Sequence, residues 1–170
     1  MFVLGIDPGL SRCGYGLVER RGSALVARSG GVITTGPVTP LPERLRTLFT
    51  ELRELVAETK PDAVVVERVF FQTNVRTAMA TGQAGGVALV AAAEAGCEVA
   101  QYTANEVKQA VVGVGSASKE QVQNMVAALL NLPRRPSPPD VADALALAVC
   151  HLTSQPLRRA IEAAGAGRRP

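Results

Sequence analysis

The chain has 170 residues, enough for one compact domain, and 47% of them are hydrophobic, so a sizeable core can form. Its formal net charge is +3, a mild basic excess that permits nucleic-acid binding without requiring it. Because there is no Trp and only 4% of the residues are aromatic, the core must be largely aliphatic.

The cysteines are Cys13, Cys97 and Cys150, which form no CxxC pair. An odd number argues against a disulfide framework, and with the single His151 they make a poor zinc-binding set. We therefore expect reduced thiols in a cytoplasmic protein. The first residues turn acidic too early for a signal peptide, and no apolar run approaches the ~20 residues that cross a bilayer, so we expect no membrane partner.

The first predicted elements are extended. Residues 2–7 are a short apolar run, and residues 14–20 and 24–34 are joined by the Gly-containing link Arg21-Gly22-Ser23, which predicts a hairpin or meander. Over residues 39–60, Leu and Val recur at helical spacing with Glu and Arg between them, which predicts an amphipathic helix.

Strands and helices then alternate. Residues 63–67 contain three successive Val without polar alternation, which is typical of a parallel strand covered on both faces. A long helix is expected over residues 73–95 and another strand over residues 97–102.

Two capping-box patterns predict where the next helices begin. Thr103 is followed by Glu106, and Ser118 by Gln121, so helices should start near residues 103 and 118. A last helix is expected over residues 138–153.

The element order β-β-β-α-β-α-β-α-α-α predicts an α/β fold, with a mixed five-stranded sheet flanked by helices on both faces. We assign residues 1–155 to this domain. Residues 156–170 carry several Arg among Ala and Gly, and we expect a flexible C-terminal tail there.

Asp7 and Glu67 each stand at the end of an apolar strand. If these strands are parallel neighbours, both carboxylates project from the carboxyl edge of the sheet, where ligands bind in open α/β sheets. Ionised groups at such places are costly unless paired, hydrogen-bonded or metal-bound. The alternative is an ordinary pair of strand-end acids that face water or a nearby Arg.

Asp140 and Asp143 are three residues apart at the start of the last helix, so they share one helix face. Asp140 follows two prolines and could simply be a first-turn residue that favours the helix dipole. Asp143 lies inside an apolar run, where an acid is harder to explain. The four carboxylates make an all-oxygen set, which Mg²⁺ or Mn²⁺ prefers, and two such ions can catalyse phosphoryl displacement.

Several stretches of the sequence occur together in the order of a known family: Gly5-Ile6-Asp7-Pro8-Gly9, Val66-Glu67 with Val69-Phe70, Gly82-Gln83-Ala84-x-Gly86-Val87-Ala88, Val107-Lys108-Gln109 with Gly113-x-Gly115-Ser116-Ala117, and Asp140-x-x-Asp143-Ala144-Leu145-Ala146. Over its first 155 residues the chain resembles the RuvC Holliday-junction resolvases. A lone GIDPG would be weak evidence, but the full set is specific.

The resemblance implies an RNase H-like fold and a homodimer that makes paired symmetric nicks in four-way DNA junctions. It assigns Asp7, Glu67, Asp140 and Asp143 to catalysis and to a site for two Mg²⁺ ions per subunit, for which Mn²⁺ can substitute. It also places the chain in DNA recombination and repair, with the RuvA/RuvB branch-migration machinery as a candidate partner.

The resemblance further implies that Phe70 approaches unstacked bases and that Lys108 and Lys119 contact DNA phosphates. From the residues alone, one Phe of the Phe70-Phe71 pair could equally be core, and lone lysines are usually solvated. Arg76 is a further candidate for the DNA-binding surface. The Gly- and Ala-rich helix over residues 73–95 could be covered by the sheet on one side and by a partner subunit on the other.

Two other functional classes fit part of the pattern. Actin-like sugar kinases and ATPases also begin with a strand followed by Asp, but they generally need two such domains and a second phosphate-binding loop. A non-catalytic junction-binding module would gain nothing from acids that face phosphates.

Overall fold

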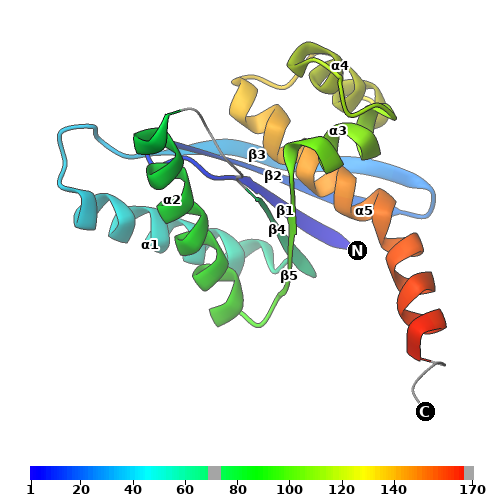
Figure 1. The fold of residues 1–170 in the computed structure, drawn as a ribbon, viewed down its shortest axis with the longest axis horizontal. Coiled ribbons are helices and arrows are strands. Elements are labelled where there is room, and N and C mark those ends of the chain that lie inside the picture. Colours follow the sequence, from blue (N-terminus) through cyan, green and yellow to red (C-terminus); the bar gives the residue numbers. More distant parts are fainter. Residues whose placement is uncertain (69–73, 167–170) are drawn as a thin grey trace.

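In a computed structural model of the chain, residues 1–68 and 74–166 are described, with side chains as far as Gln155. These residues form one five-stranded sheet in the spatial order β3-β2-β1-β4-β5 (Figure 1). The strands are β1 (Phe2–Asp7), β2 (Arg12–Arg21), β3 (Ala24–Thr34), β4 (Ala63–Glu67) and β5 (Glu98–Tyr102).

The sheet is mixed, as predicted. β1 and β2 pair antiparallel, as do β2 and β3, whereas β4 runs parallel to both β1 and β5. In the central pair Ile6 lies opposite Val66, so the last residues of the two strands, Asp7 and Glu67, lie side by side at the carboxyl edge of the sheet. The two strands are therefore parallel neighbours, which is the condition under which the two acids were expected to meet.

Helices cover both faces of the sheet, and their bounds are α1 (Leu41–Thr59), α2 (Val75–Glu94), α3 (Ala104–Val112), α4 (Lys119–Leu129) and α5 (Pro139–Ala166). Alternate strand residues face the two layers, since Leu4 packs in a core with α1 and α2, and Val3 in a second core with α3, α4 and α5. Figure 1 shows α1 and α2 on one side of the sheet and α5 on the other. None of the helices in the described ranges is long and apolar enough to cross a membrane.

Both predicted capping boxes are present. Thr103 and Glu106 exchange hydrogen bonds at the start of α3, and Ser118 and Gln121 do so at the start of α4. Each box satisfies amide groups that the first helical turn leaves without partners. The box before α4 fixes Lys119 as the first residue of that helix.

The last helix differs from the prediction because α5 continues to Ala166 rather than ending at Thr153. Pro156 suggested an end, since proline removes a helical amide hydrogen bond. The residues that follow it up to Ala166 are rich in Ala and Arg, which favour the helix.

Candidate active site

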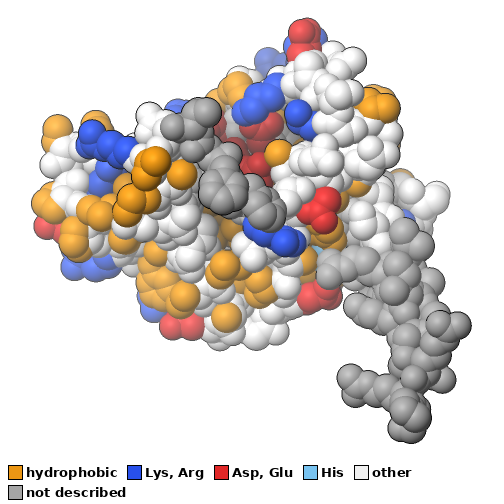
Figure 2. All heavy atoms as spheres, viewed as in Figure 1, with side chains coloured by type: hydrophobic (Ala, Val, Ile, Leu, Met, Phe, Trp, Pro, Cys, Tyr) orange, Lys and Arg blue, Asp and Glu red, His pale blue; other side chains and the backbone are white. Residues whose placement is uncertain are grey.

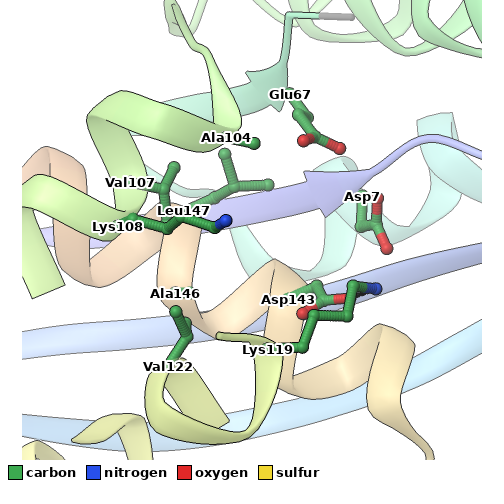
Figure 3. A pocket seen from close by; sticks show the side chains of 10 residues that line it. All are labelled: Asp7, Glu67, Ala104, Val107, Lys108, Lys119, Val122, Asp143, Ala146 and Leu147. Atoms are coloured by element: carbon green, nitrogen blue, oxygen red, sulfur yellow. Dashed lines mark hydrogen bonds and ion pairs between the residues drawn. The ribbon is translucent and has the colours of Figure 1, made fainter. Parts of the chain in front are cut away.

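Three of the four candidate acids line one cavity at the carboxyl edge of the sheet. Asp7 comes from β1, Glu67 from β4 and Asp143 from the second turn of α5, and the cavity between them has a volume of about 120 Å³. In Figure 3 the carboxylates of Asp7 and Glu67 point into this cavity from neighbouring strands, and Asp143 approaches Asp7 from the helix below. The fold thus brings together acids that are far apart in sequence.

Lys119 supplies a positive charge to this acidic site. Its ammonium group donates a hydrogen bond to Oδ2 of Asp143 over 2.8 Å, and the pair lies beside Asp7 (Figure 3). This hydrogen bond is the main reason why the pKa of Lys119 is raised. The start of α4 is therefore linked directly to the acidic cavity.

Asp140 is placed differently from the other three acids, because it does not line the cavity. It lies in the first turn of α5, as the simpler interpretation expected, and pairs with Arg12 at the start of β2. The Nη2 and Nε atoms of Arg12 donate to the same Asp140 oxygen over 2.8 and 3.3 Å. The hydrogen bond from Arg12 is the largest cause of the lowered pKa of Asp140.

A row of glycines lets α5 come close enough to bring its acids to the sheet. Gly5 pairs with Gly16, and Gly16 pairs with Gly30, so the row crosses β1, β2 and β3. A Cβ on Gly5 would overlap the carbonyl oxygen of Ala144, and one on Gly16 would lie 2.7 Å from Cγ of Leu145. The first turns of α5 are therefore held directly against the strands.

The carboxylates in the cavity perturb one another. Burial is the largest cause that raises the pKa of Asp7, and together with the negative charges of Glu67 and Asp143 it brings this pKa to about 7, against the opposing effect of Lys119. Burial also raises the pKa of Glu67. Acids that resist ionisation together need a cation to stabilise their charged forms.

The chemistry of these residues fits a hard divalent metal ion. The donors are carboxylate oxygens, which Mg²⁺ and Mn²⁺ prefer. No three described His, Cys, Asp or Glu side chains already form a metal-binding cluster. Instead, Lys119 forms an ion pair with Asp143 and Arg12 forms one with Asp140. The positive charge that these acids require therefore comes from basic side chains. His151 is buried with Tyr102 and is not among the cavity residues.

The candidate DNA-binding residues differ in whether they line this cavity. Lys108 of α3 lines the same cavity as Lys119, whereas Arg76 is exposed in the first turn of α2 and does not line it. Figure 2 shows acidic side chains recessed between α2 and the α3–α4 helices, with basic side chains at the rim. Phe70 and Phe71 lie outside the described residues.

Arg12 is the member of the site that sequence reasoning missed. Its only sequence signal is its position five residues after Asp7, on the strand that follows Pro8-Gly9. Its partner Asp140 is 128 residues away, so the pair follows from the tertiary fold alone.

Comparison with known proteins identifies the family. The family model described as "Crossover junction endodeoxyribonuclease RuvC" matches residues 3–151. A relative of that name from Trichlorobacter lovleyi is 52% identical over 158 residues, which cover 93% of this chain and 88% of the relative.

Solved structures of RuvC identify the same family. The Thermus thermophilus RuvC structure superimposes with a TM-score of 0.85 at 39% identity, covering 92% of this chain and 96% of that one. The structure of T. thermophilus RuvC in complex with Holliday junction substrate gives a TM-score of 0.87. The yeast mitochondrial Holliday junction resolvase Ydc2, at 14% identity and a TM-score of 0.64, shares the fold. The fold is thus RNase H-like, and the chain belongs to the RuvC family of crossover junction endodeoxyribonucleases.

Proposed function

We propose that this chain, a nuclease of the RuvC family that acts on Holliday junctions, cuts them with Asp7, Glu67, Asp143 and Asp140 as metal-binding catalytic residues. The observation that carries the assignment is the cavity that Asp7, Glu67 and Asp143 share, in which burial and mutual repulsion raise the pKa of Asp7 to about 7. RuvC-family nucleases are metal-dependent. The all-oxygen donor set favours Mg²⁺, with Mn²⁺ as a substitute and two ions per subunit.

Bound divalent ions would supply an activated water and would stabilise the leaving oxygen of an in-line displacement, which gives 5′-phosphate and 3′-hydroxyl ends. Asp7 and Glu67, on adjacent strand ends, would hold the ions at the carboxyl edge of the sheet. Asp143 would join them from α5 when its ion pair with Lys119 is released. Asp140 completes the set from the preceding turn of the same helix face.

The basic residues at the cavity would hold the DNA backbone. Lys108 and Lys119 reach the cavity from α3 and α4, where their charges offset the repulsion between phosphate and the acids. Arg76 extends the basic surface from α2. We assign Phe70 to contact with unstacked bases on the strength of the family resemblance.

The active molecule in this proposal is a homodimer with α2 at its interface. Val75, Met79 and Val90 are exposed on α2, at 70%, 62% and 52%. Gly82 and Gly86 lie on the same face, and a Cβ on either would meet open space, so packing within the subunit does not require glycine there. Such an apolar face with small residues suits close approach by a second copy. Two copies related by a two-fold axis present two cavities to two strands of like polarity in a four-way junction.

We place this activity in the cytoplasm, in recombination and repair, with the RuvA/RuvB branch-migration machinery as a partner. The three cysteines are free thiols, which suits a reducing compartment.

The test is a nicking assay on a mobile four-way junction with and without Mg²⁺. Paired nicks at symmetric positions that require the metal, with ends that a ligase reseals, are expected. Metal-independent binding without nicking would instead identify a junction-binding module.

A further inference from the structure

Arg12 holds the one candidate acid that stands outside the cavity. Both of its hydrogen bonds go to a single oxygen of Asp140, so the ion pair has a defined geometry. A guanidinium group carries five N–H donors, and two of them are engaged here. The Arg12 side chain is half exposed, at 50%, so its other donors are open to a ligand from solvent.

The position of Arg12 connects Asp140 to the rest of the site. Arg12 begins β2, and two residues later Gly14 lies opposite Asp7 in the β1–β2 pair. Asp140 and Asp143 are on the same face of α5, and Asp143 already lines the cavity. Arg12 and Lys119 thus each neutralise one acid of α5 beside the Asp7 strand end.

We infer that Arg12 is a positioning residue that keeps Asp140 out of the metal site in the free enzyme and exchanges it for a DNA phosphate when a junction binds. This inference rests on the proposed function, because it takes Asp140 as a metal ligand. Guanidinium binds carboxylate and phosphate in the same two-donor manner, so the exchange preserves the hydrogen bonds of Arg12. Release of Asp140 then adds a carboxylate to the cavity at the moment when substrate is present.

The first test measures Mn²⁺ affinity without DNA, by calorimetry or by the electron paramagnetic resonance signal of free Mn²⁺. Arg12→Ala frees Asp140, so we expect Mn²⁺ to bind roughly two- to fivefold more tightly, the range that an exposed ion pair permits. In an Asp140→Asn background the same substitution should change the affinity little. An unchanged affinity, or an equal gain in both backgrounds, overturns the inference.

Arg21→Ala is the matched control. Arg21 lies at the other end of β2, forms a 2.8 Å ion pair with Glu19 and is similarly exposed at 58%. The substitution removes one positive charge from the same strand, as Arg12→Ala does, but at a place away from the acids. It should therefore leave the Mn²⁺ affinity unchanged.

The second test asks whether Arg12 exchanges Asp140 for a DNA phosphate when a junction binds. Junction binding is measured in EDTA at several salt concentrations, where no cleavage occurs. Arg12→Ala should reduce the salt slope by about one unit, because one phosphate contact is lost. An unchanged slope means that Arg12 stays on Asp140, which overturns the exchange.

The proposed metal site and the proposed role of Arg12 are contradicted by different results. If Asp7→Asn leaves both Mn²⁺ binding and nicking intact, the proposed metal site itself is wrong. If Asp7→Asn abolishes both but Arg12→Ala changes neither Mn²⁺ affinity nor the salt slope, only the role of Arg12 is wrong.

Discussion

Gly14 on β2 lies directly beneath the main chain of Asp140 on α5. A Cβ added to Gly14 would overlap the Asp140 carbonyl oxygen and lie 2.9 Å from the Asp140 Cβ. Gly14 also lies opposite Asp7 in the β1–β2 pair. The absence of a side chain at one strand position therefore sets how closely an acid of α5 approaches the acid at the end of β1.

Gly14→Ala should therefore affect both stability and activity. The overlap is with backbone atoms, so the helix has to shift, and overpacking of this kind costs about 1–3 kcal/mol. We expect a lower melting temperature and a loss of nicking at temperatures where the variant remains folded.

The control for this substitution is Gly85→Ala, because Gly85 is buried in α2 and an added Cβ there would meet Pro8 at an ordinary 3.8 Å. Alanine favours a helix interior over glycine, so this variant should be as stable as the parent or more so. A Gly14→Ala protein with unchanged stability and activity would contradict the proposed role of this close approach.

The stability of the metal-free protein should depend on pH through Asp7. Because the pKa of Asp7 is raised from 3.8 to about 7, the folded state binds more protons than the unfolded chain between these values. The free energy of unfolding, measured in EDTA, should therefore fall as the pH rises through this window. Asp7→Asn should flatten the dependence, since Asn does not titrate. A divalent metal binds the ionised form, so its affinity should increase with pH over the same range.

Lys119→Ala should weaken junction binding and reduce the salt slope by about one unit if Lys119 contacts a phosphate. Arg46→Ala is the control, because Arg46 is exposed on α1, across the sheet from α4. Equal slopes for the parent and for Lys119→Ala would mean that Lys119 serves only as the partner of Asp143.

Some of this site could be predicted from the sequence because local patterns specify it. Apolar runs that end in Asp7 and Glu67 predicted two strands, and the registers show that these strands are parallel neighbours. The capping boxes at Thr103 and Ser118 placed the starts of α3 and α4, since each box needs only four successive residues.

Other features depend on contacts between distant segments, which local patterns do not contain. The pairing of Arg12 with Asp140 spans 128 residues and that of Lys119 with Asp143 spans 24. The row of glycines has a role only because α5 crosses it. The continuation of α5 beyond Thr153 does not follow from the sequence pattern, because Pro156 disfavours a helix locally whereas the residues after it favour one.

A substitution on α2 tests the homodimer. Met79→Glu places a charge in the middle of the exposed apolar face of α2, so it should shift the protein toward monomers in sedimentation and reduce paired nicking. Leu129→Glu alters a hydrophobic residue that is 39% exposed on α4, and it should leave the oligomeric state unchanged. A dimer that persists in Met79→Glu at low concentration would place the interface elsewhere.

The central claim is that the carboxylates at the sheet edge hold the catalytic metal, and Asp7→Asn tests it most directly. Nicking of a four-way junction in Mg²⁺ and junction binding in EDTA are measured on the same preparation, with Glu51→Gln on α1 as a control. We predict that Asp7→Asn abolishes nicking and retains binding, because Asn keeps the size of Asp but loses its charge. Nicking by Asp7→Asn at the rate of the parent protein would contradict the account.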